Sequence, residues 1–176
     1  MFASPTLPKH MNLIAIAQKS IKQLMLVGTV STVLTGVFTS VFLAPSNAQS
    51  ATKTITLGDR VEPNPLAVVG QAGGDATPVE IVATENTATG SCNGFISEQP
   101  NHILVLDSFF EFLKLEVSSP SDTTMIVQGP GGVWCNDDSN DANPAIGGQW
   151  QPGKYNIWVG SYQENTKDNY QLSISD

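Results

Sequence analysis

The chain has 176 residues, a length that predicts one domain and an additional segment. Its formal net charge is −8, and the part after position 48 carries five Lys/Arg against all sixteen Asp/Glu, a net charge of −11. This acidic balance argues against nucleic acid and anionic membranes as partners, because both require a basic surface.

The N-terminal segment has the pattern of a secretory signal. Three lysines precede the uncharged, mostly apolar run Leu24–Ala44, and small residues follow at Ser46 and Ala48. This order of basic, apolar and small residues predicts a signal peptide helix over residues 1–48 that is cleaved after Ala48. We therefore expect a secreted or periplasmic protein with no membrane attachment after cleavage.

Two alternatives stay open for this segment. The apolar run has 21 residues, enough for a helix to span a bilayer, so an uncleaved N-terminal helix could anchor the protein in the membrane. The run also contains six Ser or Thr residues, which make it less apolar than most anchors, and we favour cleavage. Translation could start at Met1 or at Met11, since the first ten residues add nothing that a signal requires.

Residues 49–64 are polar and irregular in pattern. Pro63 and Pro65 limit regular structure there, so the stretch is predicted to be a flexible tether. Thr54–Leu57 could lie on the domain. The folded domain is expected over residues 65–176.

The domain sequence has the pattern of short β-strands. In Phe112–Val117 apolar residues alternate with charged ones, the period of a half-buried strand. No segment sustains a helical period over ten residues, and Gly/Pro turns recur at spacings of about ten residues. The pattern predicts an all-β fold, an antiparallel β-sandwich or jelly roll of about eight short strands. The expected strands are Leu66–Ala72, Val79–Ala83, His102–Leu106, Phe112–Val117, Thr123–Gln128, Val133–Cys135, Tyr155–Ser161 and Tyr170–Ser175.

Both cysteines of the chain, Cys92 and Cys135, fall in the exported part. An even count in an oxidising compartment predicts a disulfide, whereas two cysteines without neighbouring histidines do not predict a metal site. Gly90–Gly94 has the outline of a nucleophile elbow with Cys92 in place of the serine, but the strand before it and the helix after it are missing. No catalytic residue is expected here.

Three other candidates for catalysis have ordinary structural explanations. His102 is the only histidine of the exported part, and zinc requires several His or Cys ligands, so we interpret it as a residue at a strand end. Glu111 and Glu116 could be the carboxylates of a glycosidase, but nothing fixes their separation, and a solvated strand face is the default for them.

The loop 136–143 is rich in acidic and amide side chains. Calcium binds six to eight oxygen ligands from flexible loops, so the composition suits Ca²⁺, with Asp137, Asp138 and Asp141 as the candidate ligands. The spacing does not match an EF-hand loop. The alternative is that Asn and Asp cap turns with their own side chains, and we favour this alternative. The acidic and amide side chains of the loop are Asn136, Asp137, Asp138, Asn140, Asp141 and Asn143.

Aromatic residues surround the same loop. Trp134, Trp150 and Tyr162 are candidates for a stacking platform that would bind a carbohydrate, because aromatic side chains are enriched at binding surfaces. The alternative is that they fill the core, which we favour for Trp158 because it lies within a strand. Trp134 and Trp150 flank a loop, and both interpretations stay open for them.

Motifs along residues 122–172 form a recognisable order. They are Asp122-Thr123-Thr124, Ile126, Gly129-Pro130-Gly131-Gly132, Cys135-Asn136-Asp137-Asp138, Gly153-Lys154-Tyr155, Trp158-Val159-Gly160-Ser161 and Tyr170-Gln171-Leu172. This order resembles the bacterial pre-peptidase C-terminal-type domains, which are secreted β-sandwiches. Pro63–Gly74, Cys92-Asn93-Gly94 and Pro100-Asn101-His102 also resemble a stand-alone subgroup of them.

The resemblance implies a fold and a compartment rather than a reaction, since such domains accompany secreted hydrolases or stand alone. We predict an exported, non-catalytic β-sandwich domain, a monomer that acts as an accessory or interaction module at or outside the cell envelope. The alternative is a carbohydrate- or cell-envelope-binding module, with or without Ca²⁺. A hydrolase is the least supported function, and no cofactor other than Ca²⁺ is expected.

Overall fold

The computed structural model of the protein describes residues 51–176. The predicted signal peptide, its cleavage site after Ala48 and the alternative membrane anchor lie outside these residues. Within the described part of the chain, no helix is long and apolar enough to cross a membrane.

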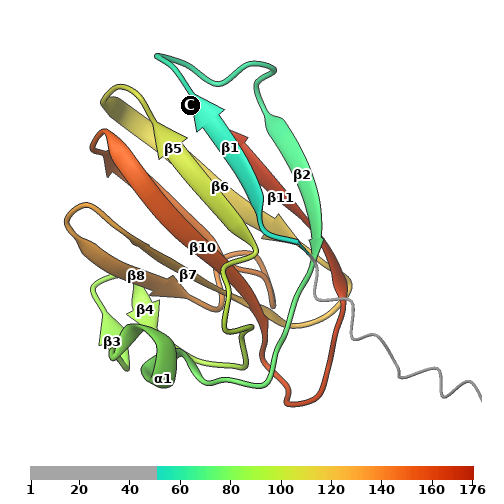
Figure 1. Cartoon of the computed structure of the whole chain (residues 1–176). Helices are drawn as coiled ribbons and strands as arrows, with labels where there is room; N and C mark the ends of the chain where they lie inside the picture. Colours follow the sequence, from blue (N-terminus) through green and yellow to red (C-terminus); the bar gives the residue numbers. More distant parts are fainter. Residues whose placement is uncertain (1–50) are drawn as a thin grey trace, which may run out of the picture. The chain divides into compact units, whose positions relative to one another are not determined.

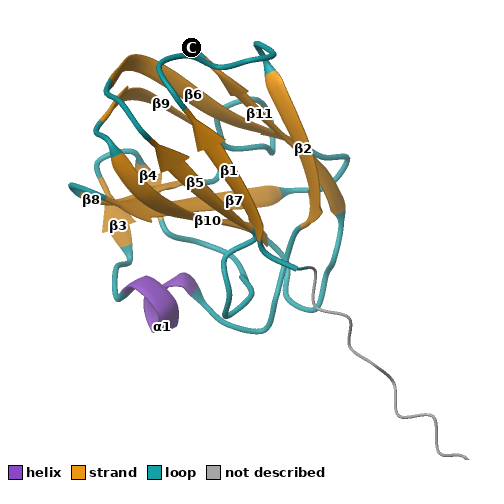
Figure 2. Ribbon diagram, turned by 45° about the horizontal axis from the view of Figure 1, so that its top comes forward, coloured by secondary structure: helices purple, strands orange, loops and turns teal. Residues whose placement is uncertain are grey.

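Two β-sheets pack against each other to form the domain (Figures 1 and 2). The five-stranded sheet has the order β1-β5-β10-β7-β8 and the four-stranded sheet the order β2-β11-β6-β9. The predicted all-β sandwich is therefore confirmed, and every predicted strand except Val79–Ala83 is present. The strands are β1 (Lys53–Leu57), β2 (Leu66–Gln71), β3 (Asn86–Thr87), β4 (Gly90–Ser91), β5 (His102–Leu106), β6 (Phe110–Ser118), β7 (Thr123–Gly129), β8 (Gly132–Asn136), β9 (Ala145–Trp150), β10 (Gly153–Ser161) and β11 (Asn169–Ser175).

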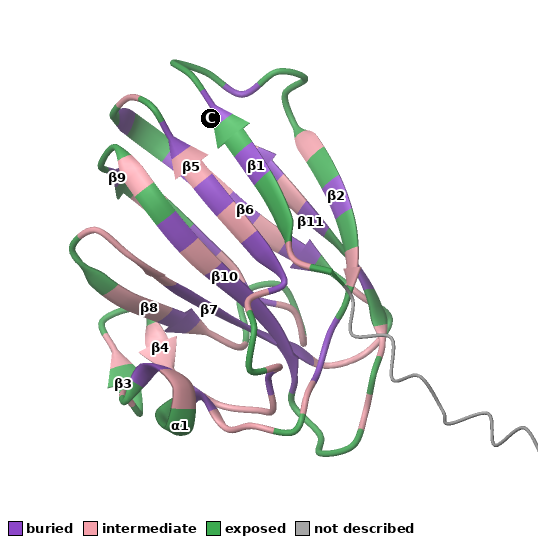
Figure 3. Cartoon of the chain, in the orientation of Figure 1, coloured by how far each residue is buried: buried purple, intermediate pink, exposed green. Residues whose placement is uncertain are grey.

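The main core lies between the two sheets. Apolar side chains at every second position of a strand point into it, for example Leu104 and Leu106 of β5 and Leu113 and Leu115 of β6. Figure 3 shows the alternation as bands of buried and less buried residues along the strands. In β6 the sequence shows this pattern as an alternation of apolar and charged residues, whereas the sequence of β5 is apolar at successive positions.

Strand β7 departs from this pattern, since Thr123–Val127 are all buried. Met125 and Val127 belong to the main core, whereas Ile126 belongs to a second, smaller core on the opposite face of the five-stranded sheet. The second core also contains Trp158 of β10. We expected Trp158 to fill the space between the sheets; it is buried as expected, but outside that space, because another segment covers this face.

The covering segment is the connection from β2 to β5, residues 72–101, called here the excursion. It contains a short helix, α1 (Pro78–Val82), and the two-residue ladder β3-β4. Its apolar residues Val82, Cys92 and Ile96 pack on the five-stranded sheet and complete the second core. The excursion and its helix lie beside β7, β8 and β10 in Figure 1. The excursion, most of which lies outside the two large sheets, is therefore held against the five-stranded sheet.

The helix α1 corrects the prediction of a strand over Val79–Ala83. Pro78 stands at the start of the helix, where its missing N–H costs nothing. The carboxylate of Glu80 accepts hydrogen bonds from the backbone N–H of Thr77 at 2.7 Å and from its hydroxyl at 2.8 Å. These contacts lower the pKa of Glu80, the backbone hydrogen bond first. The capping residues decide for a helix, and the β-branched run alone had suggested a strand.

Within the predicted tether over residues 49–64, the structure supports the alternative that Thr54–Leu57 lies on the domain. Residues 53–57 form β1, which pairs in parallel with β5 in the register Lys53 to His102 through Leu57 to Leu106. Ile55 and Leu57 enter the main core. The sandwich therefore begins before Pro65, and it has one parallel strand pair in addition to the antiparallel ones. The register depends on a partner about 50 residues away, which no local pattern shows.

Strand β9 was not predicted, because Ala145–Trp150 contains Gly147 and Gly148 and lies beside the acidic loop. It pairs with β6 and forms one edge of the four-stranded sheet. Glycine is depleted in strands because it has no side chain to pack, and the partner strand supplies the order here.

Candidate functional site

A surface cleft of about 460 Å³ lies on the excursion, between the first turn of α1 and the β3-β4 ladder. Its size falls in the range of about 300–1,000 Å³ that is usual for small-molecule sites. Glu85, Asn86, Ser91 and Asn93 contribute polar groups, and Val79 and Phe95 contribute apolar surface. Only Glu85 is charged among the described residues that line the cleft.

Hydrogen bonds hold the polar wall of the cleft in place. The Ser91 hydroxyl donates to Asn86 Oδ1 at 3.0 Å. The amide Nδ2 of Asn93 donates to Asp137 Oδ2 at 2.8 Å, which joins the excursion to the acidic loop. The Nδ2 group of Asn86 and the Oδ1 atom of Asn93 are not used in these contacts, so each residue can still bind a ligand.

The predicted disulfide is present and fixes the cleft to the sheet. Cys92 lines the cleft and is bonded to Cys135 of β8, with a Cα–Cα distance of 5.1 Å. The hydroxyls of Thr87 and Thr89 bind the backbone of Cys135, accepting from its N–H at 3.1 Å and donating to its carbonyl at 2.9 Å respectively. Cys92 carries no thiol in this state, so the resemblance of Gly90–Gly94 to a nucleophile elbow has no chemical consequence.

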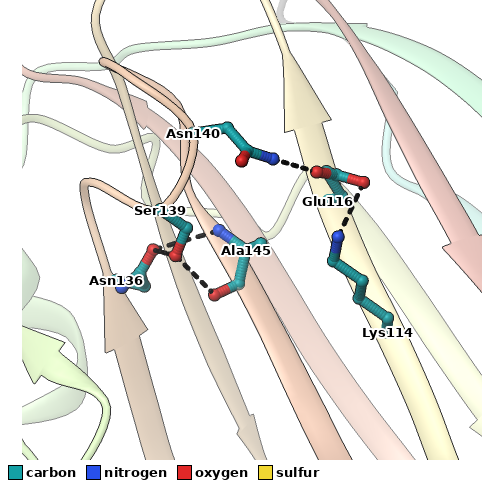
Figure 4. A network of polar contacts seen from close by, with 6 residues as sticks. All are labelled: Lys114, Glu116, Asn136, Ser139, Asn140 and Ala145. Carbon is teal, nitrogen blue, oxygen red and sulfur yellow. Dashed lines mark hydrogen bonds and ion pairs between the residues drawn. The ribbon is translucent and has the colours of Figure 1, made fainter.

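The acidic loop after β8 is ordered by its own side chains (Figure 4). The side-chain oxygen of Asn136 accepts hydrogen bonds from the Ser139 hydroxyl at 2.8 Å and from the Ala145 N–H at 3.0 Å. Asn140 donates to the carboxylate of Glu116, which also pairs with Lys114 at 3.0 Å. These contacts are those expected of turn-forming Asn and Ser side chains.

Among the described residues, no hydrogen bond joins the three candidate calcium ligands to one another or to a shared partner. Asp137 is bonded to Asn93, whereas Asp141 is exposed and sits in a turn with a φ of 53°. Within residues 51–176, no group of three or more His, Cys, Asp or Glu side chains is arranged to hold a metal ion. Calcium binding stays a prediction.

The structure adds Asp122 to the acidic surroundings of Asp137 and Asp138. Burial raises the pKa of Asp122 first, and the negative charges of Asp138 and Asp137 raise it further. Its Oδ1 is buried and has no hydrogen-bond partner among the described residues. The carboxylate of Asp122 is therefore electrostatically unfavourable in the folded protein.

The aromatic residues proposed as a platform are divided by the fold. Trp150 is only 5% exposed, and its Nε1 donates to the backbone oxygen of Leu113 at 2.9 Å. Trp134 is half-buried and lies 6.2 Å from Trp150 between ring centroids. Tyr162 is 50% exposed. It follows the last residue of β10, whereas Trp150 comes before the first residue of β10, so the two aromatic residues lie at opposite ends of that strand. The three do not form one surface, and Trp150 is a core residue.

His102 is a core residue rather than a ligand or an exposed base. Its side chain is 2% exposed, and Nε2 lies 2.7 Å from the hydroxyl of Tyr170. Burial and, to a smaller extent, the positive charge of Lys53 lower the pKa of His102 to about 4. Burial also raises the pKa of Tyr170. The pair joins β5 of one sheet to β11 of the other, so it serves the packing of the sandwich.

The carboxylates Glu111 and Glu116 have separate surroundings. Glu111 is exposed on β6, and Glu116 contacts Lys114 and Asn140. Nothing in these contacts prepares them as an acid and a base.

The sequence did not identify the cleft residues, which come from positions 77–79, 85–86 and 91–95 of the excursion. Two asparagines, Asn86 and Asn93, flank Cys92 there. A cysteine that ties a turn-rich segment to the sheet was the available signal, since functional side chains are often carried by loops on a rigid scaffold.

No family model matches the chain. An uncharacterised protein of Synechococcus elongatus is 30% identical over 86 residues, which is 47% of this chain and 63% of that protein. The match therefore spans less than two thirds of the relative's length.

Solved structures that are similar to this chain include a domain of a collagenase and a lysozyme inhibitor. The pre-peptidase C-terminal domain of a collagenase from Bacillus anthracis is 14% identical, with a TM-score of 0.43, over 73% of this chain and 99% of that domain. PliG of Aeromonas hydrophila, a periplasmic inhibitor of g-type lysozyme, is 16% identical, with a TM-score of 0.39, over 71% of this chain and 98% of that protein. The first is a domain of the kind that the motifs of residues 122–172 resemble.

Proposed function

We propose that the protein is an extracytoplasmic binding module, rather than an enzyme, and that it binds its partner with the cleft on the excursion. The observation that carries the proposal is the attachment of this cleft. A disulfide and the Asn93–Asp137 hydrogen bond hold a loop-built, polar surface on a rigid sandwich. Preformed polar groups at fixed positions are what a binding site requires.

The state of the reactive side chains supports binding over catalysis. Cys92 is used in the disulfide, and His102 is buried against Tyr170. The disulfide also supports a location outside the cytoplasm, because cytosolic reductants keep most thiols reduced. The N-terminal pattern that ends at Ala48 agrees with this location.

Co-sedimentation with the insoluble cell envelope of the producing organism tests the proposal. The protein is expressed from the full chain and purified in its oxidised form from the extracytoplasmic fraction. We expect it to pellet with the envelope, and Asn86→Lys to reduce the bound fraction at least tenfold, because Asn86 is an exposed residue of the cleft.

Val69→Lys is the matched control. Val69 is 72% exposed on β2, which belongs to the other sheet, so the same charge is added away from the cleft. This variant should bind as the wild type does. Equal loss in the two variants, no binding by the wild type, or recovery of the protein from the cytoplasm alone would contradict the proposal.

A further inference from the structure

We propose that the cleft binds one unit of a neutral saccharide. The inference rests on the proposed function, and it gives that binding site a ligand class. It also moves the carbohydrate hypothesis from Trp134, Trp150 and Tyr162, which do not share a surface, to residues 77–95.

The described lining of the cleft offers an anionic ligand no positive charge. Glu85 is an exposed lining residue, and Oδ2 of Asp137 accepts a hydrogen bond from Nδ2 of Asn93 at 2.8 Å. None of the described lining residues is Lys, Arg or His, so phosphates and carboxylates would meet only negative charge.

The hydrogen-bonding groups favour a ligand with hydroxyls. The amides of Asn86 and Asn93 offer both donors and acceptors, and a hydroxyl can use either. A purely apolar ligand would leave these groups without partners, which is unfavourable. A protonated amine has donors alone and could not accept a hydrogen bond from Nδ2 of Asn86. Its attraction to the exposed Glu85 would be screened by water.

The apolar part of the cleft completes the match. Phe95 is half-buried, and its backbone is fixed by hydrogen bonds with Ser161 at 2.8 and 3.1 Å. Val79, on the first turn of α1, is 44% exposed. A sugar ring has hydroxyls around its rim and C–H groups on its faces, so it can use the amides and the apolar surface together.

The test measures amide chemical shifts of the ¹⁵N-labelled, oxidised protein, purified after export of the full chain. The probes are D-glucose, N-acetyl-D-glucosamine, glucose 6-phosphate and cadaverine. We expect saturable shifts in residues 77–95 with at least one of the two neutral sugars and a Kd on the order of 1 mM, typical of a small polar ligand. Glucose 6-phosphate, which differs from glucose by its charge, should bind at least fivefold more weakly, and cadaverine should not bind.

The variants locate the site. Asn86→Ala should weaken sugar binding at least fivefold, and Asn169→Ala, an exposed asparagine at the start of β11, should leave it unchanged. Phe95→Leu, which keeps apolar bulk but removes the ring, should also weaken it. A well-dispersed spectrum confirms that each variant is folded.

Three results would overturn the inference: no saturable shift at residues 77–95 with either neutral sugar up to about 50 mM, tighter binding of glucose 6-phosphate or cadaverine, or full sugar binding by Asn86→Ala. If envelope binding still depends on Asn86, the ligand class alone is wrong and the binding module stands. If envelope binding is also independent of Asn86, both proposals fail.

Discussion

At the residue scale, the buried His102 makes the stability of the domain depend on pH. Its pKa is about 4 in the folded state and about 6.5 when the side chain is exposed. Between these values the unfolded chain binds a proton that the folded protein does not, so stability falls as the pH drops from about 6.5 to 4. Above pH 6.5 both states are neutral at this residue, and its contribution to stability is fully present.

His102→Gln tests this prediction, because glutamine can still bond to Tyr170 but does not titrate. From pH 7.5 to pH 4 the wild type should lose roughly 3 kcal/mol more of its unfolding free energy than the variant does. Urea denaturation at several pH values measures the unfolding free energy of both proteins. The two proteins have the same carboxylates, so the effect of these groups cancels in the comparison. Parallel pH profiles would show that His102 does not cause the acid sensitivity.

Asp122 has the opposite effect on stability. Its pKa is raised in the fold by burial, then by Asp138 and Asp137, so the folded state disfavours the charged form. The penalty is present above the raised pKa and disappears as the pH falls through it. We predict that Asp122→Asn raises the melting temperature at pH 7 by about 2 °C, and that the gain shrinks in acid. Thermal melts of both proteins at pH 7 and pH 3 measure this; a lower melting temperature for the variant at pH 7 would contradict it.

Calcium would act on the same carboxylates. If Ca²⁺ binds Asp137 and Asp138, with Asp122 beside them, the wild type should melt at a higher temperature in Ca²⁺ than in EDTA. Asp122→Asn should then lose part of this shift, while Asp141→Asn tests the third predicted ligand. A melting temperature that is the same in Ca²⁺ and EDTA would exclude the calcium hypothesis for this loop.

At the scale of elements, the excursion depends on close backbone packing at Gly74. A Cβ atom at this position would lie 2.2 Å from the backbone oxygen of Ile96, which pairs with Ala76. Backbone at this distance must move, so Gly74→Ala should cost about 1–3 kcal/mol of stability and loosen the cleft. Gly58→Ala is the matched control, since no atom lies within 4 Å of its Cβ position. Chemical denaturation measures the stability of both variants. Equal stabilities would show that the excursion can accommodate a Cβ atom at position 74 without loss of stability.

Two elements differ from what the pattern of apolar residues in the sequence predicted. Val79–Ala83 is rich in β-branched residues, but Pro78 and the contacts between Thr77 and Glu80 start a helix there. Ala145–Trp150 contains two glycines, but β6 pairs with it across the sheet edge. In both segments a contact outside the pattern of apolar residues decided the structure.

At the scale of the whole molecule, the disulfide joins the excursion to β8 over a separation of 43 residues. Closing a loop of this length stabilises the fold by roughly 4 kcal/mol in the chain-entropy estimate. We predict that Cys92→Ala/Cys135→Ala loses up to this amount and that amide exchange rises most in residues 77–95, whose cleft is fixed by the bond. Wild type reduced with dithiothreitol should behave like the double variant. Equal stability of the reduced and oxidised wild type would contradict the prediction.

The sequence by itself determined the class of fold and most of its strands. Residues 112–117, 155–161 and 170–175 alternate in polarity because one face of each strand is buried, and short apolar or β-branched runs indicated the other strands. Cys92 and Cys135 were paired by count and compartment, and the turn-forming role of the Asn-rich loop followed from its residue types. The tertiary structure alone decided the pairing of β1 with β5, the burial of Trp150, the place of Trp158 under the excursion and the assembly of Asn86, Asn93 and Phe95 around one cleft. Alternation reports which residues are buried but not against what, and a site built from a folded-back connection exists only once the sheet beneath it has formed.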